Sequence, residues 1–398
     1  MHHLINNYIT KSSMKKIILS LAMAAAIVSC NSSKTVDDPL AESGRTQRTE
    51  NLLANLRKIS ANGYLIGHQD DPVYGVGWVG DSCRSDVKSV CNDYPALIGF
   101  DLGHLELGDS VNLDGVPFNR MREEIIRQYD RGGMVTLSWH LDNPLTRGSA
   151  WVKPDSLTDQ EKQTVASVLE GGECHEKFLG WLDTLASFLN SLETPYGVKV
   201  PVLFRPWHEH TGSWFWWGQN LCTADQYKAL WKLTEDRLKE KGVNNVLYAY
   251  SPGTEFAGDA DKYLERWPGD GMVDVIGFDT YCTNNPEDTT AINNYRNGLD
   301  LGLKTICEIA KQHNVVPALS ETGMESLGME NWWTEVLMPV LNKYPIAYVL
   351  LWRNAHDKPG HFYMPYPGQK TVSDFVKFYN DKRTLFVKDI NGLYLQVN

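Results

Sequence analysis

Hydrophobic and polar positions along the chain follow two alternating patterns. Short runs rich in β-branched and aromatic residues are typical of strands, and the longer stretches between them have apolar residues at helical spacing. Eight runs are predicted strands: Tyr64–Ile66, Ala96–Phe100, Met134–Trp139, Val200–Phe204, Val246–Tyr250, Val273–Phe278, Val315–Leu319 and Ala347–Trp352. The clearest predicted helices are Arg120–Tyr129, Glu176–Leu192, Ala224–Lys241, Leu299–His313 and Trp332–Lys343.

Strands that alternate with amphipathic helices indicate parallel β/α units. Glycine follows some of the predicted helices, as at Gly132 and Gly242, where a left-handed residue can end a helix. Eight such units predict an α/β fold, a (β/α)8 TIM barrel, formed by a single catalytic domain over residues 45–398. An open doubly wound sheet is the alternative, but no GxGxxG motif follows the first predicted strand.

Residues 1–30 have the pattern of an export signal. Lys15 and Lys16 precede the short apolar run Ile17–Val28, and Cys30 follows a small residue. We predict a bacterial lipoprotein signal peptide with lipid attached to Cys30; a plain secretory signal is the alternative. Residues 31–44 are polar and without periodicity, as in a flexible tether.

The expected location follows from this signal. The protein should be exported and lipid-anchored in a Gram-negative bacterium, either on the periplasmic face of the outer membrane or on the cell surface. No acidic run directly follows Cys30, which favours the periplasmic face.

Composition narrows the range of partners. The net charge is −11, and the first 29 residues contain three lysines and no acid, so the remainder is more acidic still. This argues against nucleic acid as a partner, and against contact with a membrane other than through the lipid anchor. We expect a monomer. Of the six later cysteines, Cys83 and Cys91 could form a disulfide, and the others are expected to be buried free thiols.

Polar, titratable and aromatic residues follow seven of the eight predicted strands. They are Gly67–Asp70, Asp101–His104, Trp139–Asp142, Arg205–His210, Asp279–Tyr281, Ser320–Gly323 and Trp352–Asn354. The C-terminal ends of barrel strands meet at one rim, where the active sites of such barrels lie. The sequence therefore predicts a polar site at this rim.

Glu209 and Glu321 follow the fourth and seventh predicted strands, on opposite sides of the barrel mouth. Cleavage of a glycosidic bond needs a carboxylic acid that protonates the leaving oxygen and a second carboxylate that acts as nucleophile or base. A structural salt bridge is the alternative for either glutamate taken alone. Two of them among aromatic residues favour the catalytic interpretation.

The surroundings of the two glutamates predict different roles. The sequence neighbours of Glu209 are Trp207, His208 and Trp214. An apolar wall of this kind would raise the pKa of Glu209 and favour the acid role. Glu321 is expected near Arg205 and Tyr281, whose donors would keep it ionised as a nucleophile.

The segment Trp207–Gly218 (WHEHTGSWFWWG) is the densest aromatic stretch in a chain with 13 tryptophans. The apolar faces of sugar rings stack on indole, so aromatic loops of this kind are typical of carbohydrate grooves. Of the four successive rings at 214–217, we expect one or two to face substrate. Further candidates for contact with sugar are Trp151, Trp352, His140 and His208, whereas His68 is expected in the interior.

Other chemistries lack support in the sequence. No HExxH motif or comparable spacing of metal ligands is present, and neither a GxSxG motif nor a phosphate-binding loop occurs. We therefore expect neither a metal nor an organic cofactor.

Several segments resemble the glycoside hydrolases of family 26, chiefly β-mannanases. They are RPWHEHTGSWFWWG around Glu209, SETG around Glu321, SWHLDNP at 138–144, GFDTY at 277–281 and LWRNA at 351–355. The resemblance extends over residues 45–398. It implies a (β/α)8 barrel that cleaves β-1,4-mannosidic bonds of mannan, galactomannan or glucomannan by retaining double displacement. Glu209 would be the acid/base and Glu321 the nucleophile, with their carboxyl groups about 5 Å apart.

The same resemblance implies roles for residues around this pair. His208 and Tyr281 would support the two glutamates, and Trp352 would lie under the sugar at the cleavage point. The residues implied for the glycone side are His140, Trp151, Trp214 and Arg353. Asp101 and Arg205 match rim positions to which no role is assigned.

One difference from some relatives follows the nucleophile motif, where residues 323–327 (GMESL) offer no aromatic side chain. How the distal glycone subsite is built is therefore open, and so is the choice between internal cleavage and release of mannobiose from chain ends. A β-1,3/1,4-glucanase or a xylanase would use the same two carboxylates. Outside the enzyme class, the alternative is a glycan-binding lipoprotein, which would not need such a pair.

Overall fold

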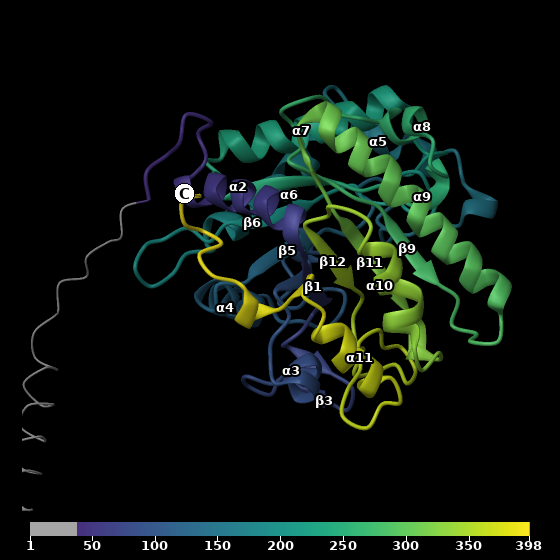
Figure 1. Cartoon of the computed structure of the whole chain (residues 1–398). Coiled ribbons are helices and arrows are strands. Elements are labelled where there is room, and N and C mark those ends of the chain that lie inside the picture. The colour runs from purple at the N-terminus through teal and green to yellow at the C-terminus, as the bar shows by residue number, and fades with distance from the viewer. Residues whose placement is uncertain (1–37, 398) are drawn as a thin grey trace, which may run out of the picture. The chain divides into compact units, whose positions relative to one another are not determined.

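The computed structural model describes residues 38–397 (Figure 1). The predicted signal peptide, Cys30 and the first half of the predicted tether lie outside these residues. The end of the predicted tether, residues 38–44, forms a turn in which Leu40 pairs with Thr46. Thr46 then caps the helix α2 (Gln47–Asn62), because its hydroxyl accepts a hydrogen bond from the backbone N–H of Thr49.

Within the described residues, eleven short strands form one parallel sheet. The strands of the barrel are β1 (Tyr64–Gln69), β4 (Leu97–Asp101), β5 (Met134–Ser138), β6 (Val202–Arg205), β7 (Val246–Tyr250), β8 (Val275–Ile276), β9 (Asp279–Cys282), β10 (Val316–Pro317), β11 (Leu319–Met324) and β12 (Tyr348–Leu351). A further strand, β13 (Thr384–Leu385), pairs with the start of β1. Their order in the sheet is β10-β8-β7-β6-β5-β4-β1-β12-β11-β9.

The strand order begins with β10 and ends with β9, and each of these two strands lies next in sequence to another strand of the sheet. Only Gly277 and Phe278 separate β8 from β9, and only Ala318 separates β10 from β11. Since β8 pairs with β10 and β9 pairs with β11, each of these segments is one barrel strand with an interruption. The described residues therefore contain eight parallel barrel strands that close into a ring. The predicted (β/α)8 barrel is confirmed, and each of its strands overlaps a predicted one.

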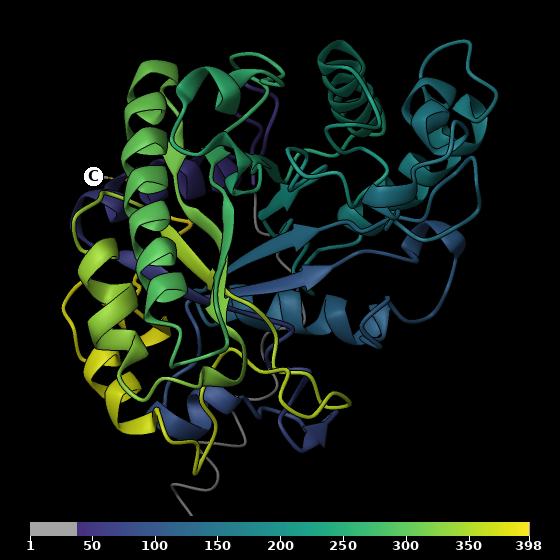
Figure 2. The same cartoon turned by 90° about the vertical axis from the view of Figure 1, so that its right-hand side faces the viewer.

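Helices surround the strands (Figures 1 and 2). Besides α2 they are α3 (Asp86–Cys91), α4 (Phe118–Asp130), α5 (Thr164–Val168), α6 (His175–Asn190), α7 (Ala224–Glu240), α8 (Ala260–Leu264), α9 (Thr289–His313), α10 (Met338–Leu341) and α11 (Val372–Tyr379). A small antiparallel hairpin, β2 (Tyr74–Gly75) with β3 (Trp78–Val79), follows β1. Residues 194–198 form a separate turn, closed by a 2.9 Å hydrogen bond from Thr194 N to Val198 O.

Two predicted helices differ from the observed ones. The helix α9 begins at Thr289, before the predicted start, because Asp288 accepts a hydrogen bond from Ala291 N and caps a first turn that lacks an apolar pattern. The segment predicted as one helix from Trp332 starts as a π-helix, η6 (Trp332–Leu337), and continues as α10. Pro339 has no N–H to donate to a carbonyl of the preceding turn, which fits the wider π geometry there.

The cysteines of the described residues are all free thiols. Cys83 is exposed, Cys91 is partly buried, and neither forms a disulfide. The other cysteines among the described residues are buried free thiols, as expected: Cys174, Cys222, Cys282 and Cys307. Within residues 38–397, every helix is too short or too polar to span a membrane.

Candidate active site

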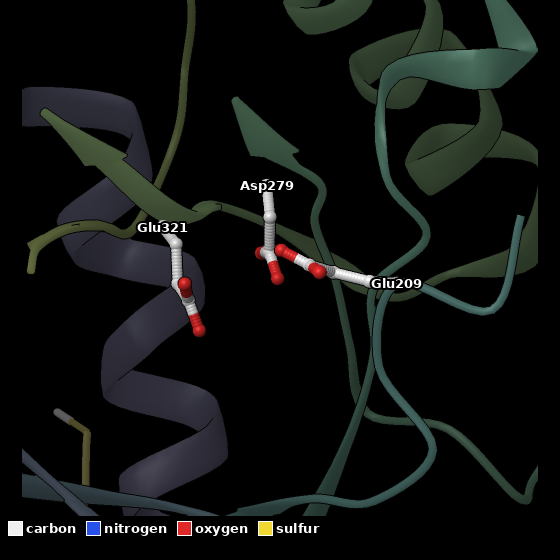
Figure 3. Close-up of side chains that lie close together, drawn as sticks. All are labelled: Glu209, Asp279 and Glu321. Carbon is white, nitrogen blue, oxygen red and sulfur yellow. The ribbon is translucent and has the colours of Figure 1, made fainter. Parts of the chain in front are cut away.

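Three carboxylates from different barrel strands meet at the rim (Figure 3). Glu321 lies on β11, Asp279 begins β9, and Glu209 lies in the loop after β6. One carboxylate oxygen of each lies within 4.8 Å of the others. The sequence placed all three at strand ends, but it suggested roles only for the two glutamates. The fold thus brings Glu209 and Glu321 close enough to act on one bond.

The loop that carries Glu209 has an unusual backbone conformation. Trp207 and Glu209 have φ angles of 56° and 52°, in the left-handed region that residues with a Cβ rarely adopt. Two hydrogen bonds of 2.8 Å hold the loop: Glu209 N donates to Ser251 O, and Trp217 Nε1 donates to His208 O. Backbone strain that the surroundings enforce is frequent at active sites, where it aims a side chain. The Glu209 side chain points toward Asp279 and Glu321 (Figure 3).

Glu209 is partly buried and has one direct donor. The indole Nε1 of Trp214 donates to its Oε2 at 2.7 Å. Burial raises the pKa of Glu209 to about 7, the nearby charge of Glu321 adds to the rise, and the Trp214 hydrogen bond and the charge of Arg205 oppose it. A carboxyl group with this pKa holds a proton near neutral pH, as a general acid must. The sequence predicted a raised pKa for Glu209, and the direction of the shift is right, although the hydrogen bond from Trp214 itself lowers this pKa.

Glu321 is buried, and both of its carboxylate oxygens have donors. Arg205 forms an ion pair with Oε1, and the hydroxyl of Tyr281 donates to Oε2 at 2.6 Å. Arg205 is buried as well, and Asp279 and Glu321 outweigh the effect of burial and raise its pKa, so it stays charged. These contacts stabilise a negative charge on Glu321 and fix its orientation. The neighbours predicted for Glu321 are therefore in contact with it.

Asp279 is the carboxylate whose importance the sequence did not indicate. Its Oδ2 accepts a 2.7 Å hydrogen bond from Arg205 Nη1, which also donates to Ser251 Oγ at 3.0 Å. Burial raises the pKa of Asp279 well above its ordinary value; Arg205 opposes this rise, and the two glutamates reinforce it. Three carboxylates this close could also hold a cation. Arg205 already forms ion pairs with two of them, Asp279 and Glu321.

Asp101, His140 and His208 form a buried chain beside the glutamates. His140 Nδ1 lies 2.7 Å from Asp101 Oδ2, and His140 Nε2 lies 3.0 Å from His208 Nε2. Burial opposes a charge on His140, but Asp101 outweighs it and raises the pKa of this histidine. Burial, Arg205 and His140 lower the pKa of His208 well below its ordinary value. Asp101 and His140 thus hold a neutral His208 in a fixed orientation next to Glu209.

The aromatic candidates differ in exposure. Trp151 is 48% exposed and stacks on His140, with 4.9 Å between ring centroids and 6° between ring planes. Trp352, after β12, is partly exposed, and its backbone N donates to Thr322 O beside Glu321. In the 214–217 segment only Trp214 keeps appreciable exposure, since the next three rings are buried. One ring of the four is thus partly exposed, and its contact with substrate stays a prediction.

Arg353 lies in a second buried network, which the sequence did not reveal. Its Nη2 forms a 3.0 Å ion pair with Asp114, and its Nη1 donates to the hydroxyl of Tyr74 at 3.1 Å. The same hydroxyl donates to Asp70. Asp114 lies in the loop after β4, so this network joins the ends of β1, β4 and β12. Asp114 lies in a loop and Tyr74 in the short strand β2, and because neither belongs to a recognisable motif, neither could be identified from the sequence.

Comparison with known proteins adds to this geometry. The model of glycosyl hydrolase family 26 matches residues 41–334. Among solved structures, a family-26 β-mannanase from Bacteroides ovatus is 52% identical, with a TM-score of 0.82, and the match covers 88% of this chain and 98% of that one. A modular endo-β-1,4-mannanase from Cellulomonas fimi is 32% identical, with a TM-score of 0.77, over 89% of this chain and 79% of that one.

Curated relatives are mannan endo-1,4-β-mannosidases that differ in length. A mannan endo-1,4-β-mannosidase from Bifidobacterium adolescentis is 28% identical over 94% of this chain, which spans only 38% of that longer protein. A mannan endo-1,4-β-mannosidase from Bacillus subtilis is 27% identical over 72% of this chain and 76% of the relative. With a family match over more than half of its length, and with two facing glutamates at the barrel rim, the chain belongs to glycosyl hydrolase family 26 and is a glycoside hydrolase.

Proposed function

We propose that this glycoside hydrolase cleaves β-1,4-mannosidic bonds in mannan, galactomannan or glucomannan with retention at the anomeric carbon. The observation that carries the proposal is the pair Glu209 and Glu321, whose oxygens lie within 4.8 Å and whose surroundings differ. Retaining enzymes separate their two carboxyl groups by about 5–5.5 Å, whereas inverting enzymes leave about 6.5–9.5 Å for a water molecule. The short separation supports retention.

In the first step, Glu321 attacks the anomeric carbon while Glu209 gives its proton to the departing glycosidic oxygen. The surroundings support this division of roles. The partly buried Glu209 has a pKa of about 7 and can supply a proton near neutral pH. Glu321 has an ion pair to Arg205 and a hydrogen bond from Tyr281, both of which favour the ionised form that a nucleophile needs.

In the second step, Glu209 accepts a proton from water, which attacks the anomeric carbon and releases the sugar from Glu321. Formation of the ester with Glu321 removes a negative charge near Glu209 and lowers the pKa of Glu209, so Glu209 holds its proton before the first step and is ionised, as a general base must be, after it. The coupling follows from the contribution of Glu321 to the raised pKa of Glu209. Arg205 remains near the glutamate that regains its charge.

The substrate class rests on the relatives. The Bacteroides ovatus structure is a β-mannanase, and the curated proteins from Bifidobacterium adolescentis and Bacillus subtilis are mannan endo-1,4-β-mannosidases. The partly exposed Trp151, Trp214 and Trp352 support a groove that stacks sugar rings. We expect His140 and Arg353 to add polar contacts on the glycone side.

The experiment that tests this function measures the reducing ends released from mannan, glucomannan, xylan and mixed-linkage β-glucan. Activity on the first two, together with a β-configured first product in time-resolved NMR, would support the proposal. Preference for xylan or β-glucan would overturn the substrate, and an α-configured first product would overturn retention. The chain lengths of early products then separate internal cleavage from release of mannobiose.

We further propose that the exported protein is lipid-anchored through Cys30, either on the periplasmic face of the outer membrane or on the cell surface. The support is the basic and apolar pattern that precedes this cysteine. Expression of the full chain with Cys30→Ala should move the protein from the membrane to the soluble fraction, whereas Cys83→Ala, at an exposed later cysteine, should leave it membrane-bound. Retention of the Cys30→Ala protein in the membrane fraction would overturn the anchor.

A further inference from the structure

The strand that carries Glu321 leaves one position at the rim without a side chain. Because side chains alternate along a strand, residues 321 and 323 of β11 point to the same face. Residue 323 is glycine, so β11 itself fills no space one step beyond Glu321. On the neighbouring β9, Asp279 pairs with Glu321, and Tyr281 pairs with Gly323. The rim therefore has an inner layer with two carboxylates and an outer layer with Tyr281 and a vacant position.

The ring of Tyr363 occupies this position. A Cβ atom on Gly323 would overlap Cδ1 of Tyr363. The Tyr363 ring also packs edge-on against Tyr281, with 5.7 Å between centroids and 67° between planes. Tyr363 belongs to the loop after β12, distant from Gly323 in sequence. An aromatic side chain thus stands beside the glutamate even though residues 323–327 contain none.

The loop that carries Tyr363 is held in place from both sides. Asn354 Oδ1 accepts 2.9 Å hydrogen bonds from the backbone N–H groups of Tyr363 and Met364. Ser326, just after β11, donates from its backbone N to Phe362 O at 2.9 Å. A side chain fixed in this way loses little further freedom when it contacts a ligand. Tyr363 is therefore pre-organised at the rim.

The hydroxyl group of Tyr363 is available to a ligand. The residue is 8% exposed, and within residues 38–397 its hydroxyl has no hydrogen-bond partner, although it is not sealed from solvent. Burial and the charges of Glu325 and Glu321 raise the pKa of Tyr363, so the hydroxyl keeps its proton. A protonated phenol with no protein partner can donate to a sugar hydroxyl.

We propose that Tyr363 is a substrate-binding residue whose hydroxyl donates to the sugar on the glycone side of the cleaved bond. The inference rests on the proposed function, in which Glu321 bonds to the anomeric carbon of that sugar. Tyr363 packs on the Glu321 strand and on Tyr281, which itself contacts Glu321. Its position is therefore tied to the nucleophile and to the sugar that the nucleophile holds.

The test compares Tyr363→Phe with a matched control, Tyr366→Phe. Tyr366 lies in the same loop and is partly buried, and its hydroxyl also lacks a partner among the described residues. The substrate is nitrophenyl β-mannobioside, in which only the glycone side carries mannose. We expect kcat/KM to fall about 5- to 15-fold in Tyr363→Phe, as for the loss of one hydrogen bond, and to stay unchanged in the control. Both variants should keep the parent Tm, since each retains its ring.

A kcat/KM for Tyr363→Phe within about twofold of the parent value would overturn the inference. A loss on mannotetraose without a loss on the nitrophenyl substrate would overturn it as well, because the contact would then lie on the other side of the bond. The parent enzyme reports on the proposed function separately: that function fails if the parent cleaves neither substrate. Calorimetric binding of mannotriose to Glu321→Gln, with and without Tyr363→Phe, shows whether the hydroxyl contacts sugar or only alters the nucleophile. Equal affinities would overturn the contact.

Gly323→Ala gives an independent check. Its methyl group should displace the Tyr363 ring and lower kcat/KM in the parent. In a Tyr363→Ala background the same substitution should cost much less, because the overlapping ring is gone. Additive losses in the double variant would overturn the packing on which the inference depends.

Discussion

Glu209 and Glu321 are the same residue type, and their different roles come from the groups that touch them. Glu209 has a single indole donor and lies in a loop with strained backbone. Glu321 has a guanidinium group on one oxygen and a phenol on the other. Two carboxylates this close disfavour simultaneous ionisation, so the one with weaker partners keeps the proton. The asymmetry is therefore a property of Arg205, Tyr281 and Trp214.

The first prediction at the residue scale concerns the acid. Glu209→Ala should lower kcat on mannan about 100- to 10,000-fold, the range expected for loss of general acid–base catalysis. For a substrate with a good leaving group, such as dinitrophenyl β-mannobioside, formation of the sugar ester should be nearly unaffected because no proton is needed. Burst kinetics on that substrate measure this step. Equal losses on both substrates would show that Glu209 is not the acid.

The second residue-scale prediction concerns pH. Since Glu209 must be protonated to act as an acid, kcat/KM on mannan should fall above about pH 7, where the pKa of Glu209 lies. The Trp214 donor stabilises the ionised form, so Trp214→Phe should raise the pKa of Glu209 further. We expect this to move the alkaline limb of the profile up by about one pH unit. Trp151→Phe should leave the alkaline limb in place, because Trp151 forms no hydrogen bond with Glu209. A shift of the alkaline limb in both variants would count against the Trp214 assignment.

At the scale of elements, one buried ion pair connects the loop after β4 to the end of β12. The side chains of Asp114 and Arg353 are largely buried and lie 3.0 Å apart. Asp114→Asn removes a charge and leaves the guanidinium of Arg353 poorly compensated, which should cost about 3 kcal/mol of unfolding free energy. The measurement is urea denaturation at pH 7. The control is Asp81→Asn, whose partner Arg84 and own side chain are roughly half exposed, and which should cost about 0.5 kcal/mol or less. Equal losses would mean that the buried pair does not fix the loop.

At the scale of elements, the barrel strands could be predicted from the sequence, but the paths of the long loops could not. Each barrel strand was predictable, because runs such as Val246–Tyr250 are buried on both faces and therefore uniformly apolar. Placing Glu209 and Glu321 at the rim followed from their positions after strands. Asp114 and Tyr363 could not be predicted, because each acts from a loop whose path depends on contacts with other loops. Asn354 fixes the path of the second loop through hydrogen bonds across nine and ten residues, which no local pattern encodes.

At the scale of the whole molecule, the buried carboxylates of the active site lower the free energy of unfolding near neutral pH. Burial disfavours charge on Glu209 and on Asp279, and the pKa of each is raised. The unfolded chain places no such restriction on these carboxylates. The barrel and its helices must therefore stabilise a rim that would be more stable with neutral side chains, a trade-off frequent at catalytic sites.

The raised pKa of Glu209 predicts a pH dependence of the free energy of unfolding. In the folded protein the pKa of Glu209 is raised from 4.5 to about 7, so between these values the folded state binds more protons than the unfolded state. Stability linked to Glu209 is therefore fully present below pH 4.5 and is lost as the pH rises through 7. Glu209→Gln stays neutral and can still accept the Trp214 hydrogen bond. It should match the parent near pH 4.5 and exceed it by about 2 kcal/mol at pH 8, as seen by urea denaturation at both pH values. Glu287→Gln, at an exposed position, should show no such dependence, and a Glu209→Gln variant no more stable than the parent at pH 8 would refute the linkage.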